Sequence, residues 1–442
     1  MAMSLKTPMK IRMFQRKLYA KAKAEPGFRF YLLYDKVHRE DILLHAYAVA
    51  RANKGAPGVD GLTFEAIEVA GLAQWLTGLR EELKTRTYKP QPVRRVMIPK
   101  PGGGERPLGI PTIRDRVVQT AVKLVLEPIF EADLASEAYG YRPRRSAVGA
   151  VQRVHQLLKD GYTDVVDADL AKYFDTIPHA ALMQCIARRI VDRDILHLIK
   201  AWLKVPAEET GENGRTRLVG GKRVGSGTPQ GGVVSPLLAN IYMNRFLKYW
   251  RGSGQGERLR AHVVTYADDL VILSRGSAAE ALEVMRTVMT RLGLSVNEAK
   301  TALRDARQER FDFLGYSFGL HWHRANGDRF LGASPSKKSI LRVQDKVRKI
   351  LQPSNPGTWQ DIRDRLNHVL RGWSVYFAYG SVAYAHRAVN WHVENRVRGF
   401  LQRRHQLPSR GTRQFPSSRI FGELGVHRIT RSVPDGAPYA FA

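Results

Sequence analysis

The stretch AHVVTYADDLVILSR, residues 261–275, decides the fold. Two short runs rich in β-branched and aliphatic residues meet at Asp268 and Asp269, which predicts two strands joined by a turn that carries both acids. Adjacent carboxylates repel each other, and each raises the cost of ionising the other. A bound cation would neutralise both, and Mg²⁺ prefers oxygen ligands of this kind. The alternative interpretation is a solvated acidic turn.

A third carboxylate would complete a site for two metal ions. The candidates lie in DVVDADLAKYFD, residues 164–175, where Asp167, Asp169 and Asp175 would share one face if the strand ran that far. Periodicity does not choose among them, and each could equally cap a helix or lie on the surface. Two bound ions would activate a hydroxyl nucleophile and stabilise a phosphate leaving group.

The charge of the whole chain favours a nucleic-acid partner. The 442 residues include 71 Lys and Arg against 41 Asp and Glu, a formal net charge of +30. Such an excess indicates a polyanion, with nucleic acid ahead of an acidic membrane surface. The single cysteine, Cys185, excludes a disulfide framework and a cysteine-based zinc site, and is compatible with a reducing cytoplasm. No apolar run is long enough for a membrane helix, and the basic start favours a solvated helix over a transit peptide.

Helical and strand patterns alternate along the chain, which predicts an α+β fold with four parts. Residues 1–90 form an N-terminal helical extension and the start of the next part, and residues 91–333 hold the strands and the acidic turn. Residues 334–404 are helical and basic. Residues 405–442 carry Pro, Ser, Gly and Arg with little periodicity, which predicts a loosely ordered basic tail, or a reduced DNA-binding segment.

Eight motifs in a fixed order resemble those of the reverse transcriptases encoded by bacterial group II introns, also called intron maturases. They are IPKPGGGERPLGIPTIRDR (98–116), YGYRPRRS (139–146), DADLAKYFDTIPH (167–179), GTPQGGVVSPLLANIY (227–242), TYADDL (265–270), LGLSVNEAKT (292–301), FDFLGYSF (311–318) and GWSVYFAYG (372–380). The resemblance covers residues 29 to 404. It implies a right-hand polymerase, with fingers, a palm whose antiparallel sheet carries the two-acid hairpin, and a helical thumb or maturase (X) domain.

The resemblance also implies a role for individual residues in catalysis and nucleotide binding. Asp169, Asp268 and Asp269 match the catalytic acids, which with the Leu170 carbonyl would bind two Mg²⁺ ions. The dNTP would contact two finger cations, an aromatic steric gate, the PQG turn and a lysine after the palm helix, which are Lys100, Arg106, Phe174, Gln230, Gly231 and Lys300. Taken alone, these residues fit equally well as solvated cations, a core aromatic and a turn that begins a helix.

Contacts to template, primer or RNA are implied for a further set of residues. A basic loop, a primer-grip turn and a run of thumb lysines match the family, namely Arg142, Arg144, Arg145, Phe313, Leu314, Gly315, Lys337, Lys338, Lys346 and Lys349. A solvated loop, a buried strand and a helical core are the corresponding structural interpretations. Residues 337–442 hold 19 Lys and Arg against six Asp and Glu, which suits structured or single-stranded RNA.

The predicted function is RNA-directed DNA polymerisation, coupled to binding of the intron RNA that assists splicing and to intron mobility by reverse transcription. The partners would be intron RNA, an RNA template and a DNA primer or target, in the bacterial cytoplasm and at the nucleoid during mobility. With only Cys185 present, no Cys-rich HNH-type endonuclease is expected. Two alternatives are a domesticated reverse transcriptase without a splicing role, in defence or repair, and an RNA-binding splicing factor whose polymerase is inactive.

Overall fold

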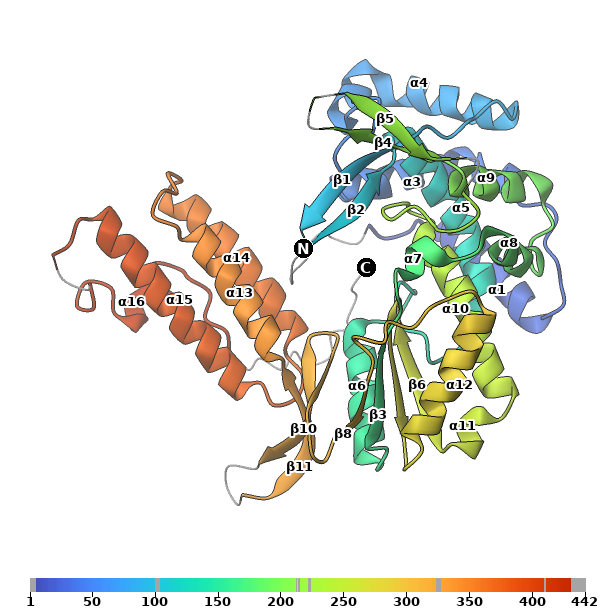
Figure 1. Cartoon of the computed structure of the whole chain (residues 1–442). Helices are drawn as coiled ribbons and strands as arrows, with labels where there is room; N and C mark the ends of the chain where they lie inside the picture. The colour runs from blue at the N-terminus through green and yellow to red at the C-terminus, as the bar shows by residue number, and fades with distance from the viewer. Residues whose placement is uncertain are drawn as a thin grey trace.

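A four-stranded antiparallel sheet forms the centre of the protein and carries the acidic hairpin (Figure 1). The computed structural model describes residues 5–99, 104–211, 213, 215–221, 224–322, 327–408 and 411–430. The strands are β3 (Asp164–Asp169), β6 (Ala261–Tyr266), β7 (Asp269–Ser274) and β8 (Ala302–Asp305), in the order β6-β7-β3-β8. The chain is α+β as expected, and this sheet takes the place of the palm that the sequence resemblance implies.

The two faces of the palm sheet pack into different cores, because successive side chains of a strand point to opposite sides. Val166 and Ile272 belong to the larger core with the palm helices, whereas Val165 and Val271 belong to a second core that includes the thumb. Helix α12 (Ala278–Arg291) covers the first face and α6 (Ala147–Lys159) covers the second. The remaining palm helices are α5 (Ile113–Glu131), α7 (Tyr173–Thr176), α8 (His179–Ala187), α9 (Arg193–Leu203), α10 (Ser235–Gly252) and α11 (Gln255–Arg258).

The fingers contain a second four-stranded sheet, which lies above the palm in Figure 1. Its strands are β1 (Val93–Pro99), β2 (Glu105–Ile110), β4 (Pro206–Thr210) and β5 (Thr216–Gly220), in the order β2-β1-β4-β5. The N-terminal helices pack beside it and against α5, and are α1 (Met9–Ala24), α2 (Tyr34–Val37), α3 (Glu40–Ala52) and α4 (Phe64–Lys84).

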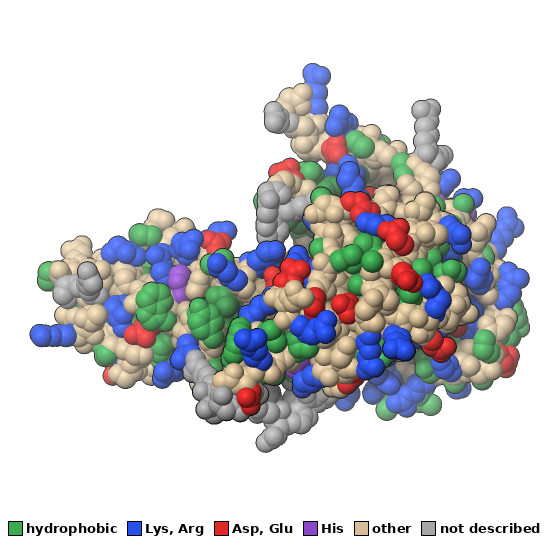
Figure 2. Space-filling model, turned by 60° about the horizontal axis from the view of Figure 1, so that its bottom comes forward, with side chains coloured by type: hydrophobic (Ala, Val, Ile, Leu, Met, Phe, Trp, Pro, Cys, Tyr) green, Lys and Arg blue, Asp and Glu red, His purple; other side chains and the backbone are tan. Residues whose placement is uncertain are grey.

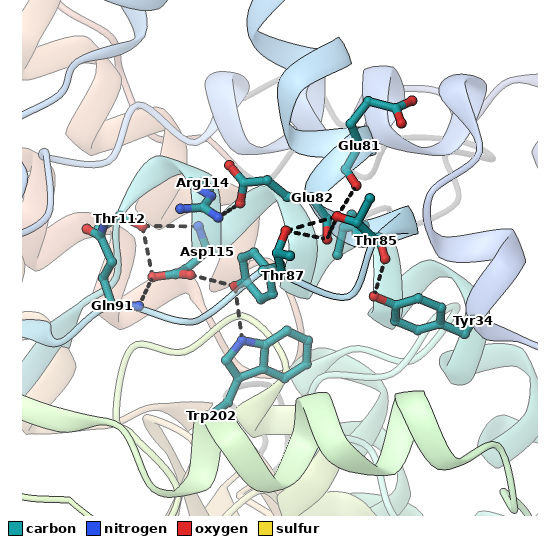
Figure 3. A network of polar contacts seen from close by, with 12 residues as sticks. Tyr34, Glu81, Glu82, Thr85, Thr87, Gln91, Thr112, Arg114, Asp115 and Trp202 are labelled. Carbon is teal, nitrogen blue, oxygen red and sulfur yellow. Dashed lines mark hydrogen bonds and ion pairs between the residues drawn. The ribbon is translucent and has the colours of Figure 1, made fainter.

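A buried polar network anchors the base of the fingers (Figure 3). The Asp115 carboxylate accepts hydrogen bonds from the Tyr88 hydroxyl (2.5 Å), the Thr112 hydroxyl (2.8 Å) and the Gln91 N–H (3.1 Å). The Tyr88 hydroxyl in turn accepts one from Trp202 Nε1 (3.3 Å). Burial raises the pKa of Asp115, and these donors offset part of that cost. The network joins the start of α5 to α9 and to the segment that leads into β1.

The thumb is a group of helices that follows a small sheet. A three-stranded sheet, β9 (Phe311–Phe313), β10 (Tyr316–Trp322) and β11 (Arg329–Pro335), ends where Ser336 caps the first thumb helix. The thumb helices are α13 (Lys337–Ile350), α14 (Trp359–Tyr376), α15 (Ala383–Arg404) and α16 (Ser417–Phe421), and they extend to one side of the palm (Figure 1).

Residues 411–430 differ from the loosely ordered tail that the sequence predicts. Asn367 binds this segment through both ends of its amide, donating to the Gly425 carbonyl (2.8 Å) and accepting from the His427 N–H (2.7 Å). Asn390 makes the same pair of bonds with Ile429 (2.8 and 3.0 Å). The segment therefore completes the thumb core. The hydrophobic periodicity of the sequence does not predict this structure, because residues 411–430 are held by contacts to helices that are distant in the chain.

Of the helices in the described ranges, none has the length and apolar character needed to cross a membrane.

Candidate active site

Asp169 and Asp269 lie directly opposite each other in the palm sheet. The register of β3 against β7 pairs Asp169 with Asp269, and that of β6 against β7 pairs Tyr266 with Asp269. A two-residue turn, Ala267 and Asp268, closes the hairpin, with Ala267 at φ +59°. Asp169 and Asp269 have the strand parity of Val165 and Val271, so they lie on the thumb-side face of the sheet.

The hairpin is held in place from the other side by the segment before α6. The Tyr139 N–H donates to the Thr265 carbonyl (2.9 Å), and the Thr265 N–H donates to the Glu137 carbonyl (2.9 Å). A Cβ on Gly140 would come within 2.5 Å of the Ala267 nitrogen. Glycine is therefore required at 140 for the backbone to support the strained turn.

The acids repel one another as the sequence predicts. The surrounding atoms remove water from the Asp269 carboxylate, and this desolvation raises its pKa. The negative charges of Asp268 and Asp169 add to the effect, and the pKa reaches about 6. The side chain still reaches solvent, so that an ion can approach it. Asp167, one step back on the same strand face, also has a pKa raised to about 6, mainly by burial.

Asp169 has protein partners that the sequence did not suggest. Its Oδ2 accepts hydrogen bonds from Asn297 Nδ2 (3.0 Å) and from Lys300 Nζ (3.0 Å). The Asn297 N–H donates to the Asp169 carbonyl (2.8 Å), which fixes the loop after α12 against β3. Lys300 therefore lies in contact with one of the three acids. Asn297 stands within the LGLSVNEAKT motif, but no feature of the sequence marked it as a partner of Asp169.

The carboxylate oxygens of the three acids and the Leu170 carbonyl are ligands that suit a hard divalent ion. In this structure the carboxylates do not point to one common position. Within the described ranges, no three His, Cys, Asp or Glu side chains form a ready metal site. The Leu170 carbonyl accepts no hydrogen bond from any described residue, so it is free to act as a ligand. Asp169 would exchange its contact with Lys300 for the ion.

Two of the residues predicted to bind the nucleotide, Arg106 and Gln230, meet at the PQG turn. Arg106 Nε donates to Gln230 Oε1 (2.6 Å), and the Gly109 N–H donates to the Gln230 carbonyl (2.7 Å). Gly231 has φ +107°, and a Cβ there would lie 2.2 Å from the Gly109 carbonyl oxygen. The turn is thus pressed against β2 of the fingers. Lys100 lies outside the described residues.

Phe174 is largely buried, with 7% of its surface exposed, and its ring packs edge-on against Tyr173 with centroids 5.6 Å apart. Its carbonyl accepts a hydrogen bond from the Thr228 N–H (2.6 Å), next to the PQG turn. The structure therefore gives this ring a core contact. Its role as a steric gate remains a prediction.

Tyr141 is a site residue that the sequence did not single out. It has φ +55°, is half exposed, and its ring lies 6.2 Å from that of Tyr266. Its pKa is raised by burial and by Asp268, and is lowered in part by Arg106. The Tyr141 ring therefore lies beside the end of β6, next to the turn that carries Asp268.

Arg142 makes contacts within the protein, and its role as a template contact stays a prediction. Its Nε and Nη2 bind the Glu131 carboxylate (3.0 and 2.8 Å), and its Nη1 donates to the Ala135 and Ala138 carbonyls. Only 4% of the side chain is exposed. Four of the five guanidinium N–H groups are therefore used within the protein. Arg144 is exposed, and Arg145 lies over the Tyr139 ring (5.1 Å), so both remain available.

The predicted primer-grip residues form a turn that belongs to the thumb as much as to the palm. Leu314 and Gly315 both have positive φ and join β9 to β10, whereas Phe313 is buried in the core. Tyr376 donates to the Leu314 carbonyl (2.9 Å), and Ser339 to the Gly315 carbonyl (2.8 Å). A movement of the thumb would therefore move this turn.

The four predicted thumb lysines all lie at the surface of α13, namely Lys337, Lys338, Lys346 and Lys349. Lys349 is paired with Asp345 (3.0 Å). Figure 2 shows Lys and Arg side chains spread over the thumb and the palm on the face in view, with fewer acids on the thumb. The exposed cations agree with a polyanionic partner.

Comparison with known proteins agrees with this geometry. Residues 98–318 match the family model described as reverse transcriptase (RNA-dependent DNA polymerase), and residues 340–415 match the maturase-specific domain of group II introns. The chain is 36% identical to protein YkfC of Escherichia coli over 74% of its own length and 92% of that protein.

Two longer proteins are also similar. The group II intron-encoded protein LtrA of Lactococcus lactis is 36% identical over half of this chain, and the putative COX1/OXI3 intron 2 protein of Saccharomyces cerevisiae is 27% identical over 71% of it. The matches span 35% and 42% of those two proteins. The chain belongs to the reverse transcriptases, the RNA-directed DNA polymerases, and within them to the group that carries a group II intron maturase domain.

Proposed function

We propose that this chain copies an RNA template into DNA at Asp169, Asp268 and Asp269, and that it binds intron RNA to assist splicing and support intron mobility. The observation that carries the proposal is the in-register pairing of Asp169 with Asp269, with Asp268 in the adjoining turn. Three carboxylates at one sheet edge are costly unless a cation compensates them. Two Mg²⁺ ions bound there would activate the primer 3′ hydroxyl and stabilise the departing pyrophosphate.

The side chains around the acids would each do a separate part of the work. Arg106 would pair with the dNTP triphosphate, since positioned cations stabilise the charge of a transferring phosphate. Lys300, already at Asp169, would transfer its contact to the pyrophosphate side and supply a proton there. The Leu170 carbonyl would complete the oxygen ligands. Phe174 would select against a 2′ hydroxyl.

Primer extension on an RNA template with Mg²⁺ and dNTPs tests the polymerase. We expect wild type to extend the primer and Asp268→Ala to show no extension. Glu280→Ala is the matched control, because Glu280 is an exposed acid on α12 paired with Arg258 (3.1 Å). Equal extension by wild type and Asp268→Ala would mean that the activity is a contaminant or that the site is elsewhere.

Binding of RNA tests the maturase part. The maturase-specific domain matched by residues 340–415 leads us to expect that a transcribed group II intron RNA binds more tightly than a transfer RNA. The exposed thumb lysines predict that the affinity falls steeply with salt. Equal affinity for the intron RNA and the transfer RNA would mean that the thumb is a general RNA-binding surface without a preference for introns. Tight, selective binding without any primer extension would instead support a splicing factor whose polymerase is inactive.

A further inference from the structure

The Gln230 side chain bridges two charged residues from different parts of the hand. Its Oε1 accepts a hydrogen bond from Arg106 Nε on the fingers strand β2 (2.6 Å). Its Nε2 donates to Asp175 Oδ1 on the palm helix α7 (2.8 Å). The three side chains form a chain of charge-assisted hydrogen bonds, which are stronger than neutral ones.

The two partners allow only one orientation of the Gln230 amide. A guanidinium has donors and no acceptor, whereas an ionised carboxylate has acceptors and no donor. If the amide turned over, its NH₂ would face Arg106 and its oxygen would face Asp175, and both hydrogen bonds would be lost. Without Asp175, the Gln230 NH₂ group would have no charged partner to hold that orientation.

The main chain around Gln230 is already held, so the side chain is the part that Asp175 controls. The Gly109 N–H binds the Gln230 carbonyl (2.7 Å), and the Thr228 N–H binds the Phe174 carbonyl (2.6 Å). Asp175 is exposed, and its side chain has no other hydrogen bond or ion pair to a described residue. Its removal should therefore leave the turn and the fold in place.

The bridge leaves most of the N–H groups of Arg106 without a partner among the described residues. Among the described residues, Gln230 is the hydrogen-bond partner of Arg106, through Nε alone, so the four Nη hydrogens remain free. A direct pair with Asp175 would neutralise the arginine and compete with a phosphate. The neutral amide between them orients the guanidinium without that competition.

We propose that Asp175 is a positioning residue for nucleotide binding: it fixes the Gln230 amide so that Gln230 Oε1 holds Arg106 toward the dNTP triphosphate. This rests on the proposed polymerase function. Asp175 acts through Gln230 and touches neither the acids nor the reacting atoms. Its effect should therefore appear in the KM for dNTP, with little change in kcat.

Single-nucleotide incorporation by the full chain tests the inference, with Asp175→Ala, Asp175→Asn, Gln230→Ala and the double variant Asp175→Ala/Gln230→Ala. We expect Asp175→Ala to raise the dNTP KM about 3- to 10-fold, as one charge-assisted hydrogen bond at an exposed site is lost, with kcat within about twofold. Asp175→Asn should fall between wild type and Asp175→Ala, because its amide oxygen can still accept from Gln230. The double variant should show no further rise over Gln230→Ala, since the two side chains act as one unit.

Three results would overturn the inference while wild-type extension stands. They are an unchanged KM in Asp175→Ala, a loss of kcat at constant KM, and a rise in KM that persists in the Gln230→Ala background. Glu280→Ala should match wild type in both constants. If Asp175→Ala does not fold, as judged by thermal melting, the exposed-acid argument is wrong and the inference fails with it. No extension by wild type would overturn the polymerase proposal as well.

Discussion

Asp169 on β3 and Asp269 on β7 occupy opposed positions in the palm sheet, and only Lys300 places a cation directly on either of them in the described part of the chain. Crowding and the neighbouring acids raise the pKa of Asp269 to about 6. The arrangement stores electrostatic repulsion that a divalent ion would relieve.

Mg²⁺ should stabilise the folded protein, because it binds the three acids in the folded state and not in the unfolded chain. Melting in Mg²⁺ should occur at a higher temperature than melting in EDTA. In Asp269→Asn we expect a higher melting temperature in EDTA and a smaller gain from Mg²⁺. The raised pKa means that ionising Asp269 at neutral pH costs more free energy in the folded protein than in the unfolded chain, and the neutral amide avoids that cost. An equal gain from Mg²⁺ in both proteins would place the ion elsewhere.

Gly231→Ala should disrupt the contact between the PQG turn and the fingers. The new Cβ would lie 2.2 Å from the Gly109 carbonyl oxygen at a positive φ, so the turn must move. We expect a loss of about 1–3 kcal/mol in urea unfolding and a strong fall in primer extension. Gly276→Ala is the control, because Gly276 also has a positive φ (+83°) but nothing lies within 4 Å of its Cβ. Similar losses in the two variants would mean that backbone strain alone matters.

Arg142→Ala should destabilise the protein by about 3–5 kcal/mol, because it leaves the Glu131 carboxylate partly buried without its partner. Arg144→Ala, two residues away and exposed, should change the free energy of unfolding by less than about 0.5 kcal/mol. It should instead weaken binding of a single-stranded RNA template and reduce the salt slope by about 0.7 for a single phosphate contact. Urea unfolding and salt-titrated binding measure the two effects. A stable Arg142→Ala protein would mean that the contact between Arg142 and Glu131 contributes little to the fold.

His321 should make the thumb-side core sensitive to acid. Burial, followed by Arg310 and His155, lowers the pKa of His321 to about 4. The unfolded chain takes up a proton near pH 6.5 while the folded chain does not, so stability is complete above pH 6.5 and declines as the pH falls toward 4. Between pH 7.5 and 5.0 we expect His321 to account for a loss of about 1–2 kcal/mol.

His321→Phe should remove that share of the pH dependence, because the ring still packs beside Phe330. Urea unfolding at the two pH values measures the difference. His197→Gln, at an exposed position on α9, should behave as wild type. An unchanged pH dependence in His321→Phe would assign the acid sensitivity to other buried histidines.

The local patterns of the sequence were enough to predict the acidic hairpin, and they led to the expected start of the thumb near Ser336. Each depends on residues close together in the chain: alternation along β7 (Asp269–Ser274), a turn at Ala267 and Asp268, and a capping serine at 336. The order of the motifs added the family and the choice of Asp169 over Asp167 and Asp175. The strand alternation, the turn and the capping serine depend only on the local backbone conformation and not on the rest of the fold.

The tertiary structure alone decided which groups meet across long separations. Arg142 and Arg144 look alike in the sequence, yet only Arg142 reaches Glu131 and the carbonyls before α6. Asn297 at Asp169 and Asp175 at Gln230 join segments that are distant in the chain.

By itself, then, the sequence determined the family and the palm hairpin, because period, turn chemistry and motif order are properties of neighbouring residues. It did not determine the partners of Arg142, Asp175 and Asn297, or the packing of residues 411–430. Those depend on hydrogen bonds and buried contacts that form only when the fingers, palm and thumb come together, and periodicity carries no information about such contacts.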